Sequence, residues 1–231
     1  MSRRNLPATL PHVTETWHFL RSPAADAAAN MALDEALLRT ATERGRVLLR
    51  VYSWLRPAVS IGYFQKFPAH LTEKHEIVRR STGGGLVYHG DGVDTTYTLV
   101  VPPDHRLYTM STADAYCTIH QAVAAAIGNQ SQVTNHKSPI PRTGYDCFQN
   151  PVHGDVMADG KKLAGAAQRR TKWGMLHQGS IAATVTAEIL RRGFSEILGV
   201  EFESYKPGAA ERTLAGKLAR EKYATDAWNR R

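Results

Sequence analysis

One segment of the chain joins three consecutive glycines to residues that can do chemistry. It runs from Arg79 to His89, reads RRSTGGGLVYH, and places Gly83, Gly84 and Gly85 between two strand-like stretches. Glycines permit a positive φ and close backbone approach, so N–H groups there could bind a phosphate or an acyl carbonyl. Taken alone, the glycines are explained better as a tight turn with surface arginines beside it. The spacing differs from G-x-G-x-x-G and a strand follows, which excludes a Rossmann dinucleotide site.

A second segment, residues 159–168, reads DGKKLAGAAQ. Asp159 and Gly160 are typical of a two-residue hairpin turn. A lysine just beyond such a turn, followed by small residues, can point into a cleft whose floor is backbone. The alternative is that Lys161 and Lys162 are an ordinary solvated pair, and the spacing alone favours this alternative.

The chain has two cysteines, Cys117 and Cys147. Two are too few for a disulfide scaffold, and we expect both to be reduced. Cys117 falls in a helical pattern, where a free cysteine packs as a small hydrophobe and is inert. Cys147 lies in an irregular stretch near the lysine hairpin, and neighbouring basic residues lower a thiol pKa from its usual ~8.5 and create a nucleophile. On the residues alone, a structural and a catalytic Cys147 are equally supported.

Other candidate groups are fewer. His89, His153 and His177 are possible general bases or polar contacts. The sequence contains no H-E-x-x-H or C-x-x-C spacing, so we predict no metal site. A G-x-S-x-G elbow and a Walker A loop are also absent from the sequence.

The hydrophobic pattern predicts the elements that position these residues. Strands come in neighbouring pairs and helices come singly, which predicts an α+β fold with a mixed, largely antiparallel central sheet flanked by helices. We expect residues 1–14 to be a flexible arm and residues 15–231 to be one domain. Helices are predicted at 23–43, with Ser22 as N-cap, and at 112–127, 186–197 and 210–221. Strands are predicted at 47–53, 59–62, 77–80, 86–88, 95–101, 156–158, 161–164 and 175–184, with a turn-rich stretch at 129–150.

Composition limits the classes of function. The 231 residues are 42% hydrophobic and 22% charged, which fits an ordered globular protein. No stretch approaches ~18 apolar residues, and the N-terminus lacks the apolar core of a signal peptide, so we expect a cytoplasmic protein away from membranes. The net charge of +8 favours an acidic partner. The basic residues are scattered rather than gathered in a stripe with aromatics, which disfavours a nucleic-acid-binding module.

Together, these segments resemble the biotin/lipoate protein ligase and transferase family. RRSTGGGLVYH is similar to its R-R-x-[ST]-G-G-[GR]-x-V-x-H segment, and DGKKLAGAAQRR to its G-[RK]-K-[VIL]-[AS]-G-[SA]-A-Q segment. TWHFLRSPAADAAANMALDEALL resembles the first strand and helix of the family, and RVYSWLRPAVSIGYFQ a further motif. EKYATDAWNRR resembles the last helix of the octanoyltransferase branch. The resemblance covers nearly the whole chain from about residue 15.

This resemblance implies the fold of a biotin protein ligase catalytic domain and assigns roles to residues. Lys162, not Lys161, falls at the acyl-contacting lysine position of the family. The other residues that fall on substrate-binding segments are Arg80, Thr82, Gly83, Gly84, Gly85, His89, Gly165, Ala167 and His177.

Residues 147–151, CFQNP, match the C-F-x-x-P segment of one octanoyltransferase branch. This match implies that Cys147 takes octanoate as a thioester from an acyl carrier protein and passes it to a lysine of a lipoyl domain or of a glycine-cleavage H-type protein. In that mechanism, backbone N–H groups of Gly83 to Gly85, or of a Gly165-Ala166 turn, assist the Lys162 ammonium. We expect a monomer that needs no cofactor.

Two alternatives stay open. In the first, the protein is a lipoate–protein ligase that uses ATP and Mg²⁺ to form an acyl-adenylate. In the second, it is a catalytically silent member, because Gln178 stands where the family usually has histidine.

Overall fold

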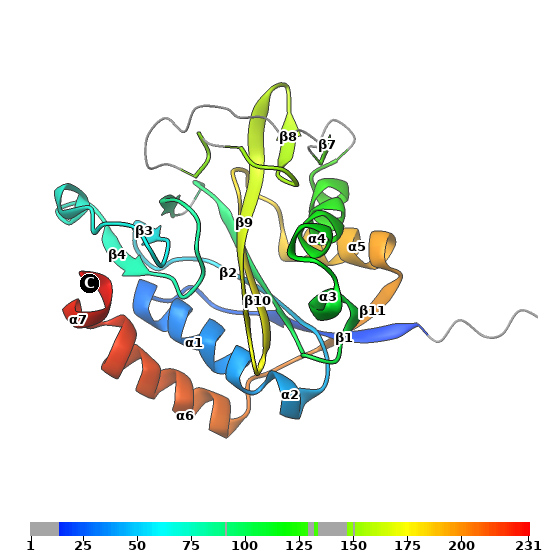
Figure 1. The fold of residues 1–231 in the computed structure, drawn as a ribbon, viewed down its shortest axis with the longest axis horizontal. Helices are drawn as coiled ribbons and strands as arrows, with labels where there is room; N and C mark the ends of the chain where they lie inside the picture. The colour runs from blue at the N-terminus through cyan, green and yellow to red at the C-terminus, as the bar shows by residue number, and fades with distance from the viewer. Residues whose placement is uncertain (1–13, 91, 129–131, 134–146, 150) are drawn as a thin grey trace, which may run out of the picture.

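A mixed sheet of eight strands forms the centre of the protein and lies between two layers of helices (Figure 1). The computed structural model describes residues 14–90, 92–128, 132–133, 147–149 and 151–231. In spatial order, the strands of this sheet are β11 (Val200–Ser204), β1 (Glu15–Arg21), β2 (Leu48–Tyr52), β6 (Thr95–Val101), β10 (Gly174–Ile181), β9 (Lys161–Thr171), β8 (Val156–Ala158) and β7 (Gln132–Val133). A small sheet contains β4 (Glu76–Arg79), β3 (Ala58–Ile61) and β5 (Val87–His89).

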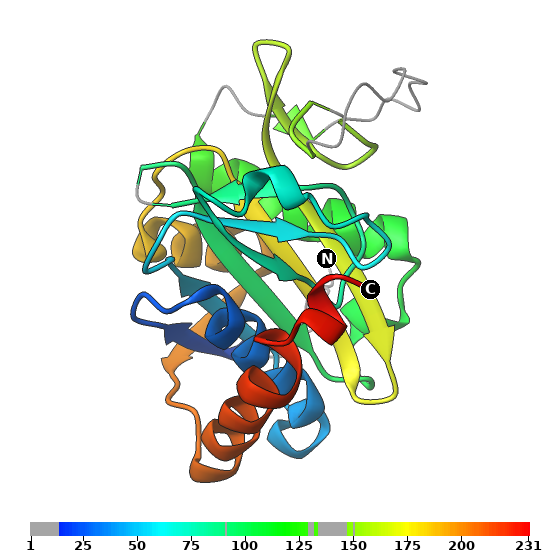
Figure 2. The ribbon, with the colours of Figure 1, turned by 90° about the vertical axis from the view of Figure 1, so that its left-hand side faces the viewer.

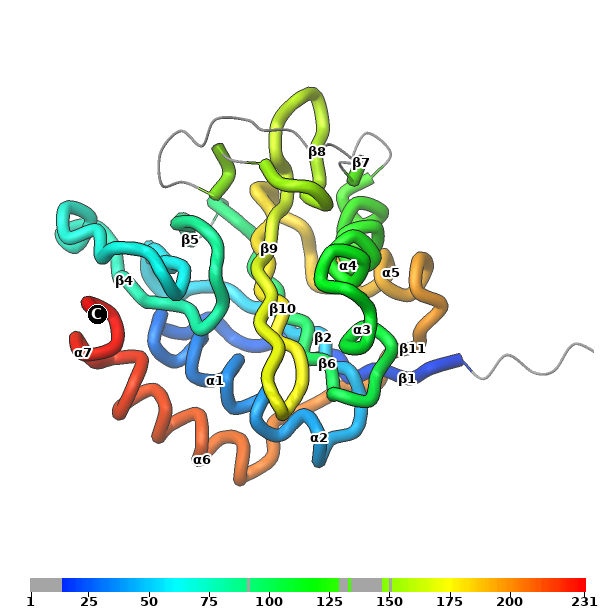
Figure 3. The backbone as a smooth tube through the Cα atoms, in the orientation of Figure 1, coloured from blue at the N-terminus to red at the C-terminus, as the bar shows by residue number. Residues whose placement is uncertain are grey.

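The helices cover both faces of the large sheet, as the tube in Figure 3 shows. One layer consists of α1 (Ala27–Arg39), α2 (Ala41–Arg44) and α6 (Ala209–Leu218), and the other of α3 (Arg106–Thr109), α4 (Thr112–Ile127) and α5 (Ala187–Leu198). A 3₁₀ turn, η1 (Ala69–Leu71), a π turn, η2 (Ala219–Tyr223), and the short α7 (Asp226–Asn229) complete the elements of the described residues. None of these helices has the length and apolar character needed to cross a membrane.

The central strand β6 shows why the sheet needs helices on both faces. Its sequence, TTYTLVV, is buried at every position, and its β-branched residues suit a strand. Alternate residues point to opposite faces. Tyr97 and Leu99 therefore pack in the core beneath α4 and α5, whereas Val100 packs against the α1 layer. The predicted mixed, largely antiparallel sheet flanked by helices is confirmed.

Two helix starts show how local capping sets the boundaries. Helix α4 occupies residues 112–127 as predicted, because the Ser111 hydroxyl accepts a hydrogen bond from the Asp114 N–H. The first helix was predicted from residue 23 with Ser22 as its cap, which is wrong. It begins at Ala27, where the Asp26 side chain accepts from Ala29 N at 2.7 Å. The chain before it stays extended because Ala25 forms a parallel bridge with Trp54.

Other differences from the sequence lie near the ends of the chain. Strand β11 was not predicted, because its sequence VEFES has two glutamates and it forms an edge of the sheet. The predicted helix at 210–221 ends at Leu218 and continues as the π turn. The predicted arm, apart from Thr14, and most of the predicted turn-rich stretch at 129–150 lie outside the described residues.

The last residues of the chain anchor the small sheet. The Arg79 guanidinium donates hydrogen bonds to the carbonyl oxygens of Trp228, Asn229 and Arg231, and also to those of Gly62, Tyr63 and Gln65. The Asn229 side chain in turn accepts from Arg79 N at 2.8 Å. Arg79 is buried, so it is not the surface arginine that an ordinary turn would carry. Figure 2 shows α7 beside this part of the molecule.

Two glycines in helices provide a test of this packing. A Cβ at Gly193 of α5 would lie 2.5 Å from the Ala122 carbonyl oxygen of α4, whereas a Cβ at Gly216 of α6 would meet its nearest neighbour, Arg220 Nη1, at 3.5 Å. We expect Gly193→Ala to lower the free energy of unfolding by about 1–3 kcal/mol, because the helices must separate. Gly216→Ala should raise it by up to about 1 kcal/mol through helix propensity. Urea denaturation measures both, and equal effects would contradict the close α4–α5 contact.

Candidate active site

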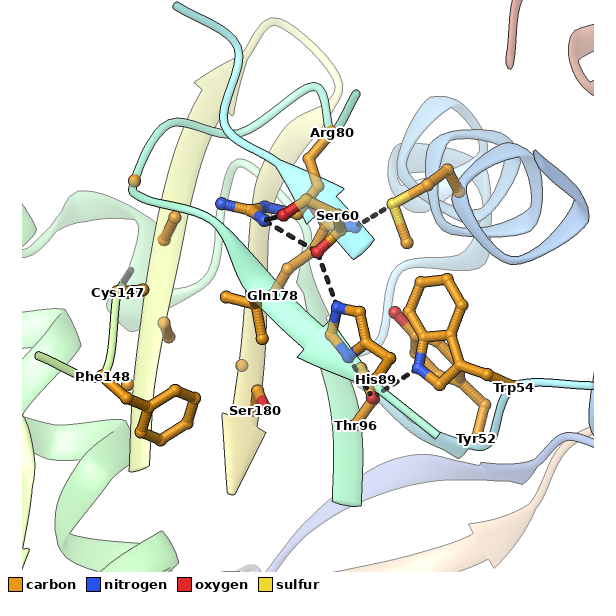
Figure 4. A pocket seen from close by; sticks show the side chains of 17 residues that line it. Tyr52, Trp54, Ser60, Arg80, His89, Thr96, Cys147, Phe148, Gln178 and Ser180 are labelled. Atoms are coloured by element: carbon orange, nitrogen blue, oxygen red, sulfur yellow. Dashed lines mark hydrogen bonds between the residues drawn. The ribbon is translucent and has the colours of Figure 1, made fainter. Parts of the chain in front are cut away.

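A narrow, mostly apolar pocket lies between the small sheet and strands β9 and β10 (Figure 4). Its empty space is about 450 Å³, a figure that includes open solvent at its mouth. Cys147 and Phe148 lie at one end, and Trp54 and Tyr52 lie at the other. The complete lining is Met31, Tyr52, Trp54, Ser60, Arg80, Gly84, Val87, His89, Thr96, Cys147, Phe148, Gly165, Ala166, Ala167, Gln178, Gly179 and Ser180.

The glycine segment forms one wall and is held in place by a buried arginine. Arg80 donates hydrogen bonds to the carbonyl oxygens of Gly83 and Gly85 at 2.9 and 2.8 Å. It also donates to the Ser60 carbonyl and hydroxyl oxygens. Gly84 has a φ of +87°, which favours glycine. The segment is therefore a specific structure cross-linked by Arg80, and the interpretation as a turn with surface arginines is wrong.

His89 fixes the far end of the pocket. Its Nε2 lies 2.6 Å from the Ser60 hydroxyl and its Nδ1 lies 2.8 Å from Asp94 Oδ2. Its ring stacks on Trp54, with ring centroids 4.1 Å apart. Burial lowers the pKa of His89, although Asp94 acts in the opposite direction. His89 is therefore a wall of the pocket, and both of its ring nitrogens already have partners.

Cys147 and Lys162 meet at the mouth. Their segments are 15 residues apart, and Lys162 Nζ lies 3.5 Å from Cys147 Sγ and 3.0 Å from the Cys147 carbonyl oxygen. The Cys147 N–H donates to Leu86 O at 2.9 Å, which fastens the cysteine loop to the glycine segment. Lys162 is only 8% exposed, while Lys161 points to solvent. The two lysines are therefore not a solvated pair.

The hairpin explains how the lysine reaches this position. Asp159 and Gly160 both have positive φ, as the predicted two-residue turn requires. The Lys162 side chain then lies across strand β9 over Gly165. A Cβ at Gly165 would lie 2.3 Å from Lys162 Cε and 2.5 Å from Nζ, so the lysine occupies space that any other residue would fill.

The predicted substrate-binding residues divide into two groups. Arg80, Gly84, His89, Gly165 and Ala167 line the pocket. Thr82, Gly83, Gly85 and His177 are absent from the lining.

Two members of the second group have clear structural positions. Thr82 donates to Gln178 Oε1 at 2.8 Å. His177 is fully buried in the core and its Nε2 lies 3.1 Å from the Tyr97 hydroxyl. Burial lowers the pKa of His177 well below its usual value. Alternate residues of β10 face opposite sides of the sheet, so Gln178 reaches the pocket and His177 cannot.

Sequence reasoning missed two residues that hold the lysine. Asp155 is fully buried and its Oδ2 lies 2.8 Å from Lys162 Nζ. The Tyr116 hydroxyl, from α4, lies 2.6 Å from Asp155 Oδ1. Asp155 directly precedes the hydrophobic start of β8, and a carboxylate at that position was the available signal.

The predicted backbone donors of the Gly165-Ala166 segment need correction. These residues lie within strand β9, not in a turn. The Ala166 N–H donates to the Tyr116 hydroxyl at 2.8 Å, so it is not free to bind a developing oxyanion. Within this hairpin, Lys162 is therefore the hydrogen-bond donor that faces the Cys147 thiol.

Cys117 lies apart from this arrangement. It is half-buried on α4, with its Sγ 3.5 Å from His153 Nε2. Burial raises the pKa of its thiol. Among the described residues, no group of three or more His, Cys, Asp or Glu side chains is placed to hold a metal ion.

Comparisons with known proteins show which sequences this chain is similar to. The family model of the lipoyl protein ligase A/B catalytic domain matches residues 26–212. The octanoyltransferase LipM of Oceanobacillus iheyensis is 36% identical over 187 residues, which cover 76% of this chain and 67% of that protein. The octanoyltransferase LipM of Halalkalibacterium halodurans is 30% identical, and the alignment covers 93% of this chain and 99% of that protein.

Solved structures share the fold. Protein Ta0514 of T. acidophilum superposes with a TM-score of 0.77 at 25% identity, covering 93% of this chain and 98% of that one. A lipoate-protein ligase A bound with ATP gives a TM-score of 0.74 at 25% identity, covering 94% of this chain and 98% of that one.

Gly165 allows a test of the lysine position. In Gly165→Ala, the new Cβ should displace the flexible end of Lys162 from Cys147, while the strand itself need not move. The displacement also weakens the buried pair of Lys162 with Asp155, so a thermal melt must show that the variant is folded. We expect iodoacetamide to alkylate Cys147 at least threefold more slowly at pH 7, because the thiolate loses a neighbouring cation. Gly208→Ala is the matched control, because its Cβ would meet nothing closer than 3.9 Å. An unchanged alkylation rate in Gly165→Ala would show that Lys162 does not influence the thiol.

Proposed function

Because this chain belongs to the family of lipoyl protein ligase A/B catalytic domains, we infer that it is an acyltransferase that moves octanoyl groups onto a lipoyl-accepting protein. The observation that carries this inference is the contact between Cys147 Sγ and Lys162 Nζ at the mouth of an apolar pocket. A thiol beside an ammonium is a nucleophile, and an apolar pocket suits an alkyl chain.

In the first step, the Cys147 thiolate attacks the carbonyl carbon of an octanoyl thioester. A new C–S bond forms as the bond to the donor sulfur breaks, and the departing sulfur takes up the proton that the Cys147 thiol had lost. As Cys147 Sγ forms its new bond, the Lys162 N–H that pointed to this sulfur turns to the developing oxyanion, which is an effect of about 10²–10³ in rate for comparable donors. The result is octanoyl-Cys147.

In the second step, the ε-amine of an acceptor lysine attacks the same carbonyl carbon. The amide bond forms, the C–S bond to Cys147 breaks, and the proton lost by the amine returns to the sulfur or to water. The oxyanion develops in the same place as before, so Lys162 serves both steps. Dividing one transfer into two is the advantage of a covalent intermediate.

We propose octanoyl-acyl carrier protein as the donor and a lipoyl domain or a glycine-cleavage H-type protein as the acceptor. The net charge of +8 supports an acidic protein as partner. Because a thioester is already activated, the reaction needs neither ATP nor another cofactor. We further propose that the protein acts as a monomer in the cytoplasm.

The thioester intermediate can be tested by intact mass spectrometry. After incubation with octanoyl-acyl carrier protein and without ATP, we expect one octanoyl group on Cys147. Cys147→Ser should form none, because an alcohol is a much weaker nucleophile at neutral pH. Cys117→Ser is the control and should be acylated as the unaltered protein is. Transfer at the normal rate by Cys147→Ser would contradict the thioester mechanism, and activity that requires ATP and free octanoate would assign the protein to the adenylate-forming ligases.

Alanine variants of the adjacent Lys161 and Lys162 provide a second matched comparison. Lys162→Ala should slow octanoyl transfer at least a hundredfold, because the thiol loses its cation and the oxyanion loses its donor. Lys161→Ala should change the rate by less than twofold, since its side chain points to solvent. Single-turnover kinetics measure the octanoyl-transfer rate of both variants. Rate losses of equal size would show that Lys162 contributes no more to catalysis than Lys161.

A further inference from the structure

The Lys162 ammonium has all of its hydrogen-bonding capacity engaged. An ammonium has three N–H donors, and three acceptors surround Nζ: Asp155 Oδ2 at 2.8 Å, the Cys147 carbonyl oxygen at 3.0 Å and Cys147 Sγ at 3.5 Å. The Lys162 and Asp155 side chains are 2% and 0% exposed. The thiol thus competes with a closer, buried carboxylate for the charge of the lysine.

The carboxylate is held in place by its own donors. The Tyr116 hydroxyl lies 2.6 Å from Asp155 Oδ1, and the Val152 N–H donates to Oδ2 at 2.7 Å. Tyr116 itself is fixed because its hydroxyl accepts from the Ala166 N–H. Asp155 therefore cannot turn away from Lys162 without leaving buried donors unpaired.

We propose that Asp155 is a positioning residue that divides the charge of Lys162, so that the Cys147 thiolate remains basic enough to be a strong nucleophile. The proposal rests on the proposed thioester mechanism. A thiolate paired with an undivided ammonium forms more readily, but its nucleophilicity falls as its pKa falls, with a Brønsted coefficient of about 0.4–0.5. The optimal attacking thiol has a pKa near the ambient pH.

Among the described residues, the buried histidine and tyrosine side chains beside this cluster do not titrate near neutral pH. Burial lowers the pKa of His120 to about 4, and it raises the pKa values of Tyr97 and Tyr116. Arg80, whose charge also interacts with Cys147, is a guanidinium and stays protonated.

The first experiment uses Asp155→Asn, which keeps the size of the side chain and removes its charge. Both proteins also carry Cys117→Ser, so that Cys147 is the one thiol that iodoacetamide can alkylate. The rate of this alkylation is measured as a function of pH. Removing a negative charge favours the thiolate, so we expect the apparent pKa of Cys147 to fall by about one unit or more. The rate of alkylation at saturating pH should fall about threefold for each unit. A thermal melt shows whether the variant is folded.

Acyl transfer provides the second readout. Measured at a pH where Cys147 is fully ionised in both proteins, Asp155→Asn should lower kcat about threefold or more and change the KM for octanoyl-acyl carrier protein by less than twofold, because the pocket itself is unaltered. A merely structural role of Asp155 would lower stability and leave the thiol pKa where it was. An apparent pKa that is unchanged or raised in the folded variant would overturn the proposal.

A measurement on the unaltered protein keeps the proposal testable if Asp155→Asn does not fold. If the charge of Lys162 is shared with Asp155, the alkylation rate of Cys147 in the unaltered protein should still rise as the pH is raised above 7, because the thiol is not fully ionised there. A rate already at its maximum at pH 7 would mean that the thiol feels the full charge of Lys162, and it would overturn the proposal. The alkylation arm requires no acyl donor. Alkylation kinetics therefore test the role of Asp155 by themselves. The octanoyltransferase assignment is tested separately, by the octanoyl adduct in intact mass spectrometry.

Discussion

The ion pair between Lys162 and Asp155 is the interaction on which the site depends. One buried ammonium joins the cysteine loop, the start of the β8–β9 hairpin and, through Tyr116, helix α4. Removing one partner of such a pair typically costs about 3–5 kcal/mol, because the other charge is left buried and unpaired. The thiol is thus positioned by the same contact that gives it its electrostatic environment. Gly165 is part of this arrangement, since the lysine lies where a side chain would be.

A second buried polar cluster lies beneath the opposite side of the pocket. Asp34 of α1 pairs with Arg50 at 2.6 Å and accepts a hydrogen bond from the Gln178 side chain at 2.7 Å. Gln178 also accepts from Thr82, so an amide links the first helix, the sheet and the glycine segment. An amide can donate and accept at once without changing its charge, which suits a position joined to a buried carboxylate. Gln178 therefore has a structural role here.

The sequence predicts much of the fold because its strands and helices carry strong local signals. Helix α4 has a serine cap and a glycine stop, and β6 is dense in β-branched residues. Strand β11 lacked such a signal, and its place beside β1 is a long-range parallel pairing that no local pattern encodes. The residues of the candidate site show the same contrast between local and long-range signals. Motifs located Cys147 and Lys162, whereas Asp155 and Tyr116 became visible only when distant segments came together. His177 was misplaced because one step along a strand reverses the face.

The anchoring of the chain end by Arg79 has a consequence for the order of assembly during synthesis. Asn229 is 150 residues after Arg79, and the glycine segment that begins beside Arg79 cannot gain this support until residues 228–231 have been made. At about 5–20 residues per second, the ribosome needs roughly 8–30 s to cover that distance. Throughout that interval, the Arg79 side chain lacks the carbonyl acceptors of Trp228, Asn229 and Arg231. The glycine wall beside Cys147 can therefore gain its last hydrogen-bonded support only after synthesis has reached residues 228–231.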